Sequence, residues 1–427
     1  AGRLFLDEQS QSPCVVAEAL IAAVLPSAAA WGIVPARRDD AARARYEDWL
    51  AEGLHAGMPC LTDYAHVKFD PSRVLPAAAS LILVALPYGG AGKDSAAGGH
   101  GADAAAETGE AGLVARVSRG RDYHKVLQTM LRRICAALQA RFPDGHFRPV
   151  CDTVPLSERF YAARAGLGTV VHSCLLGNME MGTRFVLGAV VSSNEFMVRD
   201  AGLGLAENPC TDCGLCLEAC PTRALVGPGR LDVSRCISWL TIEYKGLIAR
   251  DLWPAIGRRV FGCDVCQDVC PLNRAGAVWQ GGPAAVRTSR AAGDPGASCP
   301  GHGQAGAKSG EARDNPRTAE CPDAEVSALF STANAPGAWI PLTELLELAD
   351  DEAVRARFAG TALIRAGRRG LVRNAIIVWS NADTGPSRRP ASGEACRARV
   401  QKLCDDPDPV VAKTARQAIF EIGRAHV

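Results

Sequence analysis

The chain has 427 residues, of which 48% are hydrophobic and 22% are charged, and its formal net charge is +1. This length exceeds what one hydrophobic core usually supports, so two or three domains are expected. The nearly neutral charge excludes a general electrostatic attraction to nucleic acid, so such a role would need a local basic patch. The 17 cysteines, about 4% of the chain, are too few for a disulfide-rich scaffold.

The N-terminal region contains an apolar stretch that is too interrupted for a membrane span. The sequence VVAEALIAAVLPSAAAWGIV includes Glu18 and Pro26, so we expect a buried helix followed by a strand. Residue 1 is alanine, and no secretory signal is recognisable. Because clustered thiols are typical of a reducing compartment, we expect a cytoplasmic protein. We also expect a monomer without membrane contact.

The next part of the chain predicts a strand, a long helix and a strand. SLILVALPYG and RFVLGAVVS are apolar runs that end in turn residues, and RDYHKVLQTMLRRICAALQARF lies between them with helical apolar spacing. We therefore predict an α/β domain over residues 1–200, with an inserted loop at about 89–112. A second insertion, at 280–335, is also rich in Gly, Ala and Ser, and both are expected to be mobile. GGAGKDS resembles a phosphate-binding loop only superficially, because Asp94 replaces the required Ser or Thr.

Residues 201–279 contain eight cysteines at spacings typical of two 4Fe-4S clusters. The stretch from Cys210 to Pro221 is C-x2-C-x2-C-x3-C-P, in which the fourth cysteine binds a second cluster. FGCDVCQDVCPLN lacks one cysteine of such a run, and the distant Cys236 can replace it. We assign Cys210, Cys213, Cys216 and Cys270 to cluster 1, and Cys220, Cys236, Cys263 and Cys266 to cluster 2. Zinc and structural disulfides remain as weaker alternatives.

The C-terminal part, residues 336–427, predicts paired helices of the HEAT-repeat type. DDPDPVVAKTARQAIFEIG combines a Pro-rich turn with an apolar helical face formed by Val410, Val411, Ala415 and Ile419. The fold class is thus α+β and multidomain: an α/β domain, a ferredoxin-like double-cluster domain and a helical C-terminal domain.

Two further features allow a structural and a functional interpretation. Asp152 lies on a predicted loop before the helix that starts at Glu158, and such carboxylates are usually helix caps. RAGRRGLVRN concentrates arginines in a short stretch, which is usually a solvated face but can also bind phosphates. These arginines are Arg365, Arg368, Arg369 and Arg373.

Several motifs in this order resemble the epoxyqueuosine reductase family. They are RYEDWLAEGLHAGMPCL, RDYHKVL, DTVPLSERFYAARAGLG, NPCTDCGLCLEACPTRAL, RCISWLTIEYKG, FGCDVCQDVCPLNR and GTALIRAGRRGLVRNA. The resemblance covers most of the chain outside the two insertions. It is specific because it includes both cysteine runs and the remote cysteine.

The resemblance implies a cobalamin between the first domain and the clusters, and reduction of epoxyqueuosine to queuosine at the tRNA wobble position. It implies Asp152 as the general acid, since an epoxide oxygen needs a proton when it leaves. It also implies cofactor contacts by the residues Tyr123, His124, Thr153, Arg159, Gly166 and Gly168. The arginine run would bind the anticodon arm, and a flavodoxin or ferredoxin would donate electrons.

Alternatives remain for individual residues and for the function. His124 could be a hydrogen-bonded histidine at a helix start, and Arg159 could pair with a nearby acid. The chain departs from the family in TVVHSC, where Val171, His172 and Ser173 replace the usual Gly-Lys-Asn, and at Ala189, where the family tends to have Glu. These changes put the substrate in doubt. The other hypotheses are a cobalamin and iron–sulfur reductase of another substrate, similar to reductive dehalogenases, and a non-catalytic iron–sulfur or tRNA-binding relative.

Overall fold

The computed structural model describes residues 13–88, 110–152, 154–197, 208–274, 324–384 and 394–425. Thr153 and most of the two predicted insertions lie outside these residues. Within the described part of the chain, none of the helices combines the length and apolar character needed to cross a bilayer.

The first domain is built on a four-stranded sheet in the order β1-β2-β7-β4. All of its strand pairs are antiparallel. The predicted strands and the long helix are present, but the expected α/β arrangement, which usually has parallel strands, is not. The elements are α1 (Pro13–Val24), β1 (Ala30–Pro35), α2 (Asp40–Ala51), α3 (Pro59–Thr62), β2 (Ser80–Pro87), α5 (Tyr123–Arg141), β4 (Phe147–Val150), α6 (Glu158–Arg164), β5 (Thr169–Val170), β6 (Leu176–Gly177) and β7 (Phe185–Ser192).

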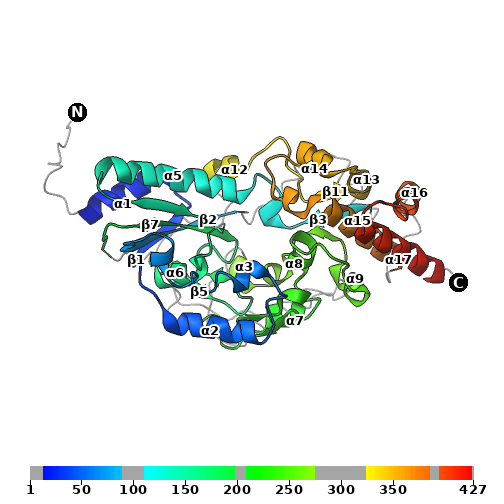
Figure 1. The fold of residues 1–427 in the computed structure, drawn as a ribbon, viewed down its shortest axis with the longest axis horizontal. Helices are drawn as coiled ribbons and strands as arrows, with labels where there is room; N and C mark the ends of the chain where they lie inside the picture. The colour runs from blue at the N-terminus through cyan, green and yellow to red at the C-terminus, as the bar shows by residue number, and fades with distance from the viewer. Residues whose placement is uncertain are drawn as a thin grey trace, which may run out of the picture.

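The sheet is covered on both faces, which explains why β2 is an unbroken apolar run. Ile82, Val84 and Leu86 face a core shared with α1 and α5, whereas Leu81 and Leu83 face a core shared with α6. Alternate side chains of a strand point to opposite faces, so a strand buried on both sides needs apolar residues throughout. Figure 1 shows α1 and α5 on one side of the sheet and α6 and α2 on the other.

The segment that carries the cysteines contains only short elements. They are α7 (Leu215–Ala219), β8 (Leu225–Gly227), β9 (Arg230–Leu231), α8 (Ile237–Ile242), α9 (Trp253–Ile256), β10 (Arg259–Phe261) and α10 (Val265–Asp268). Its second half shares a hydrophobic core with the C-terminal helices, and Trp253 and Phe261 are both nearly fully buried in that core. Residues 237–261 therefore pack as part of the C-terminal region, although in sequence they lie between cysteines that are expected to bind cluster 2.

The C-terminal helical unit comprises the described residues from 339 onward. Its elements are β11 (Trp339–Pro341), α13 (Leu342–Leu346), α14 (Asp351–Arg357), the 3-10 helix η7 (Ala362–Ala366), α15 (Gly367–Thr384), α16 (Glu394–Leu403) and α17 (Pro409–Ala425). In α17 the buried positions include Val411, Ala415, Ala418 and Ile422, while Val410 and Ile419 are only partly buried. The buried face of α17 is thus shifted by about one residue from the apolar face that the sequence predicts.

Three parts of the chain meet in a small second sheet, which corrects the predicted boundaries. β3 (Ala111–Val114) pairs with β10 and with β11, so it joins the cysteine segment to the C-terminal unit. Residues 111 and 112, predicted to be inserted loop, therefore begin a strand. Residues 324–329, also predicted to be insertion, form α12, and Val326 packs on the core beside α5.

Candidate functional site

The N-terminus of α5 carries three polar residues in a row. Asp122 is the N-cap, and its Oδ1 accepts a hydrogen bond of 3.0 Å from the backbone N–H of His124. The same oxygen lies 2.7 Å from His124 Nδ1. Asp122 also donates its own N–H to Gly360 O of the C-terminal unit, at 2.8 Å. The cap therefore sets both the start of the helix and the direction of the imidazole.

Asp152 reaches this group from the loop after β4. Tyr123 donates its hydroxyl to Asp152 Oδ2 at 2.7 Å, and His124 Nε2 lies 3.3 Å from the same oxygen. Asp152 does not cap α6, whose N-cap is Ser157. We call Asp122, Tyr123, His124 and Asp152 the Asp152 cluster.

The backbone at Asp152 is in an unusual conformation. Its φ angle is 52°, in the left-handed region that few residues other than glycine adopt. The N–H of Asp152 donates to Glu158 Oε1 at 2.8 Å, which holds the turn. The Asp152 side chain remains 55% exposed. The loop thus exposes the Asp152 carboxylate to solvent, while the hydrogen bond to Glu158 holds its backbone in place.

The protonation of the cluster follows from its hydrogen bonds. The hydrogen bond from His124 lowers the pKa of Asp152 to about 2, against the opposing effect of burial. Burial lowers the pKa of His124, but its hydrogen bonds to Asp122 and Asp152 outweigh this and raise it to about 9. Burial raises the pKa of Glu158 to about 7. At neutral pH His124 is therefore an imidazolium and Asp152 a carboxylate. The proton on His124 Nε2 is shared with Asp152 Oδ2.

Several of the other residues expected at the cofactor have structural roles. Arg159 Nη1 donates to the carbonyl of Cys174 rather than to an acid. Gly166 has a φ angle of 71°. A Cβ at Gly168 would come within 2.4 Å of Gly177 O, so the hairpin of β5 and β6 requires glycine there. Thr153 is not described.

Four cysteines line one cavity, and they are the four expected for cluster 1. Cys210, Cys213, Cys216 and Cys270 surround it together with residues that include His172 and Leu272. Burial and the three partner thiols of this set raise the pKa of Cys216 to about 12.

The four cysteines expected for cluster 2 also come together. Burial raises the pKa of Cys266, and the thiols of Cys263, Cys236 and Cys220 raise it further. Cys216 acts on Cys266 as well, so the two sets are neighbours. Cys236 is the N-cap residue of α8, so it joins this set from an element outside the two cysteine runs. The cysteines in the described ranges are free thiols.

His172, a departure from the family pattern, lines the same cavity as the four cysteines expected for cluster 1. Its Nδ1 is 2.8 Å from the backbone carbonyl oxygen of Cys213. The sequence shows that this residue is unusual, but no local pattern indicates that it lies beside Cys213.

The arginine run splits into members with different surroundings. Arg373 is fully buried and donates to the carbonyl oxygens of Leu240, Tyr244 and Gly246. It cannot reach a phosphate from this position, which corrects the expected tRNA contact for this residue. Burial lowers the pKa of Arg373 to about 10.

The remaining three arginines are ion-paired and reach the surface to different degrees. Arg368 pairs with Asp406, and its side chain is only 14% exposed. Arg369 pairs with Asp408 at 2.6 Å and is 46% exposed. Arg365 points away from these two, toward the Asp152 cluster: its Nη1 lies 3.4 Å from His124 Nε2. The run is therefore not one patch.

Comparison with known proteins agrees with these motifs. Residues 68–153 match the family described as epoxyqueuosine reductase QueG, DUF1730, and residues 209–273 match the 4Fe-4S double cluster binding domain. The Pseudomonas aeruginosa epoxyqueuosine reductase is 37% identical over 231 residues, which are 54% of this chain and 61% of that protein. The alignment thus spans about three fifths of this curated relative.

Solved structures extend the similarity over nearly the whole chain. An epoxyqueuosine reductase crystallised with a tRNA-Tyr epoxyqueuosine-modified stem loop has a TM-score of 0.71 at 25% identity, covering 95% of this chain and 89% of that one. The Bacillus subtilis epoxyqueuosine reductase, with its catalytic aspartate loop swung out of the active site, has a TM-score of 0.69 at 26% identity, covering 96% and 91%. In sequence and in fold, the chain is therefore similar to the epoxyqueuosine reductases.

Proposed function

We propose that this protein is an oxidoreductase that reduces the epoxide of epoxyqueuosine in tRNA to queuosine. The observation that carries the proposal is the Asp152 cluster. It combines a half-exposed carboxylate, a phenol and an imidazole at the meeting point of the first domain and the C-terminal unit. The similarity to enzymes of this activity supports the assignment.

The reaction defines what the site must supply. Removal of the epoxide oxygen consumes two electrons and two protons, leaves a carbon–carbon double bond and releases water. The oxygen must be protonated as its carbon–oxygen bond breaks, and a positioned general acid typically accelerates such a step by about 10² to 10⁴. We assign this role to Asp152, which is held by Tyr123 and His124 and would pass on the proton that His124 carries beside it. The catalytic aspartate loop of the Bacillus subtilis relative, which is swung out of the active site in its structure, is consistent with the exposed loop position of Asp152.

Two 4Fe-4S clusters would deliver the electrons. The match to a double-cluster domain supports both clusters, and the cavity lined by four thiols fits the first. We assign Cys210, Cys213, Cys216 and Cys270 to one cluster and Cys220, Cys236, Cys263 and Cys266 to the other.

Cobalamin is proposed from the family resemblance. When bound, it would supply a strongly reducing cobalt centre for the attack on the epoxide. The described residues fit such a group in one respect. The Asp152 side chain is 55% exposed while its backbone is held by Glu158, so a large ligand could approach the carboxylate from solvent. Tyr123 and His124, whose side chains contact the Asp152 carboxylate, would border the group. Arg159, Gly166 and Gly168 would contribute through the hairpin they support.

The tRNA would contact the C-terminal unit, whose helix pairs we interpret as HEAT-like. Arg365 and Arg369 are the members of the arginine run with substantial exposure. Arg368 is largely occupied by Asp406, and Arg373 is buried. The solved relative that carries a tRNA stem loop supports tRNA as the substrate. We further propose a cytoplasmic monomer that accepts electrons from a flavodoxin or a ferredoxin.

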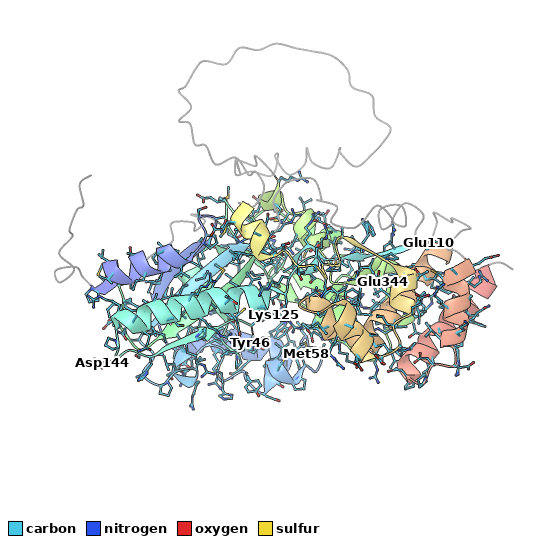
Figure 2. The ribbon with its side chains drawn as sticks, turned by 90° about the horizontal axis from the view of Figure 1, so that it is seen from above. Tyr46, Met58, Glu110, Lys125, Asp144 and Glu344 are labelled. Carbon is cyan, nitrogen blue, oxygen red and sulfur yellow. The ribbon has the colours of Figure 1, made fainter. Side chains whose placement is uncertain are left out.

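The test is turnover of the modified nucleoside. The chain would be reconstituted with iron, sulfide and cobalamin, reduced, and incubated with tRNA containing epoxyqueuosine, and nucleosides would be quantified by mass spectrometry. We expect queuosine to form and Asp152→Asn to slow its formation by about 10² to 10⁴. Asp144→Asn, at an exposed turn beyond the far end of α5 (Figure 2), is the matched control. Absence of queuosine with both clusters loaded would contradict the proposal.

A further inference from the structure

The side chain and the backbone of Asp152 are held by different helices. Tyr123 and His124, at the start of α5, contact the carboxylate oxygen Oδ2 at 2.7 and 3.3 Å. Glu158, the first residue of α6, accepts the Asp152 N–H through Oε1 at 2.8 Å. Because α5 and α6 lie on opposite sides of the sheet (Figure 1), Asp152 is held from both sides just beyond the end of β4.

The Asp152 backbone has a conformation that is unfavourable by itself. In the left-handed region, where its φ angle of 52° lies, the Cβ of an L-residue crowds the following carbonyl oxygen. Such a conformation persists only where the surrounding contacts select it. The hydrogen bond to Glu158 forms only while the Asp152 N–H points at Oε1, so it favours this conformation over the more common ones.

The acceptor oxygen of Glu158 belongs to a well-anchored part of the first domain. The N–H of Ser157 donates to the carbonyl oxygen of Lys68 at 2.9 Å, and Leu156 and Tyr161 are buried in the core between α6 and the sheet. Burial lowers the pKa of Lys68, and the negative charge of Glu158 opposes this, so the two charges interact. The chain on both sides of Glu158 is therefore fixed by contacts of its own.

The hydrogen bond does not depend on the protonation state of Glu158. Burial raises the pKa of Glu158 to about 7, so both forms are present at neutral pH. A carboxylate accepts through either oxygen, and a carboxylic acid keeps its carbonyl oxygen as an acceptor. Position 158 therefore requires an acceptor oxygen, which glutamine also provides.

The conformation of the Asp152 backbone determines where its carboxylate lies. Rotation about φ moves the Cβ relative to β4, so a relaxed backbone would carry the carboxylate away from Tyr123 and His124. The groups that face His124 are Asp122, Tyr123, Asp152 and Arg365. The hydrogen bonds to Asp122 and Asp152 raise the pKa of His124 to about 9. The titration of His124 therefore reports whether Asp152 is in place.

We propose that Glu158 is a positioning residue, which holds the Asp152 backbone so that the carboxylate stays against Tyr123 and His124 and available to the epoxide oxygen. The inference rests on the proposed function for the use of Asp152 as the acid. Glu158 itself contacts the Asp152 backbone and transfers no proton.

The titration of His124 tests this contact without substrate. The full chain with both clusters loaded would be labelled with 13C at its 8 histidines and titrated by NMR, with His124→Gln identifying the resonance. Glu158→Met, similar in size but without the acceptor, should lower the pKa of His124 by about one unit, because Asp152 no longer supports the imidazolium. Glu158→Gln should leave this pKa unchanged. Glu47→Met is the matched control, since Glu47 lies on α2 of the same domain and has Arg43 as its partner.

Two results of the titration would overturn the proposal. An unchanged pKa of His124 in Glu158→Met would show that Asp152 keeps its place without this acceptor. An equal fall in Glu158→Gln would show that the charge at position 158 acts on His124, and not the acceptor oxygen. If Glu158→Met does not fold, Glu158→Ala takes its place, because alanine also lacks the acceptor.

Kinetics extends the test to the proposed reaction. Glu158→Met should lower kcat by about tenfold to a hundredfold with little change in KM for tRNA, since a misplaced catalytic group slows the chemical step. Glu158→Gln should retain most of the activity. An unchanged kcat in Glu158→Met would overturn the role in positioning. If the unaltered protein shows no turnover, the proposed function fails, while the titration still decides whether Glu158 holds Asp152 in place.

Discussion

The cysteine segment at 210–270 and the arginine run at 365–373 each concentrate one type of residue, but their structures differ sharply. The cysteines gather into two neighbouring sets. The arginines separate: one is buried, two pair with acids at a helix start, and one enters the Asp152 cluster. Spacing predicted the arrangement of the cysteines, whereas composition did not predict that of the arginines.

The difference arises from the chemistry of the two side chains. A cysteine is short, so the gaps between cysteines limit which thiols can hold one cluster. An arginine is long and has five donors. Neighbouring arginines can therefore donate to carbonyl groups, pair with carboxylates or extend into solvent. Four predictions test this contrast, from the largest expected effect to the smallest.

Cys236→Ser should remove one cluster and leave the other. Two clusters correspond to about eight irons per chain, and about four should remain, because the other cysteine set does not include residue 236. Iron and acid-labile sulfide analysis of the reconstituted protein measures this, with Cys404→Ser in the C-terminal unit as the control. Full iron content in Cys236→Ser would remove this residue from the ligand set.

Arg373→Met should destabilise the protein, whereas Arg369→Met on the same helix should not. Removing the Arg373 guanidinium leaves the carbonyl oxygens of Leu240, Tyr244 and Gly246 without their donor, at a cost of at least about 2 kcal/mol in the free energy of unfolding. An exposed ion pair such as that of Arg369 is worth about 0 to 1 kcal/mol. Urea unfolding of the two variants compares them directly. Equal stabilities would mean that burial of Arg373 does not matter.

The protonation of His124 in the Asp152 cluster should determine how stability and reaction rate depend on pH. His124 has a folded-state pKa of about 9, above its ordinary value of 6.5. Its stabilising contribution is therefore fully present below about pH 6.5 and is lost as the pH rises through 9. The rate should fall by about tenfold per pH unit above 9, because the shared proton is lost. A rate that stays constant from pH 8 to 10 would contradict this.

Arg369→Gln should reduce the salt dependence of tRNA binding slightly, and Arg368→Gln should not. Each phosphate contact contributes about 0.7 to 0.9 to the slope of log affinity against log salt. Arg369 is 46% exposed and Arg368 only 14%. Titration of labelled tRNA at several salt concentrations gives the slopes. Equal slopes in Arg369→Gln and the unaltered protein, with intact folding, would exclude Arg369 as a phosphate contact.

Much of the fold was predictable from local patterns. The apolar runs at β2 and β7 and the helical spacing of α5 correspond to the observed elements, since burial imposes a period on the residues that face the core. The pairing of the strands was not predictable in this way, because apolar strands buried on both faces look alike in parallel and antiparallel sheets. The second sheet was also missed: its strand β3 begins where a loop was expected, and its partners lie more than 100 residues away.

The sequence by itself predicted the two cysteine sets and a loop carboxylate as the acid of the site, because thiol spacing and a loop carboxylate are local features. Only the tertiary structure decided what surrounds that acid. Asp122, Tyr123 and His124 meet Asp152 because β4 lies beside β7 under α5, and Arg365 joins them because the C-terminal unit packs against the start of α5. The pKa values of Asp152 and His124 depend on these contacts between distant segments, and electrostatic interactions of this kind act through distance in space rather than distance along the chain.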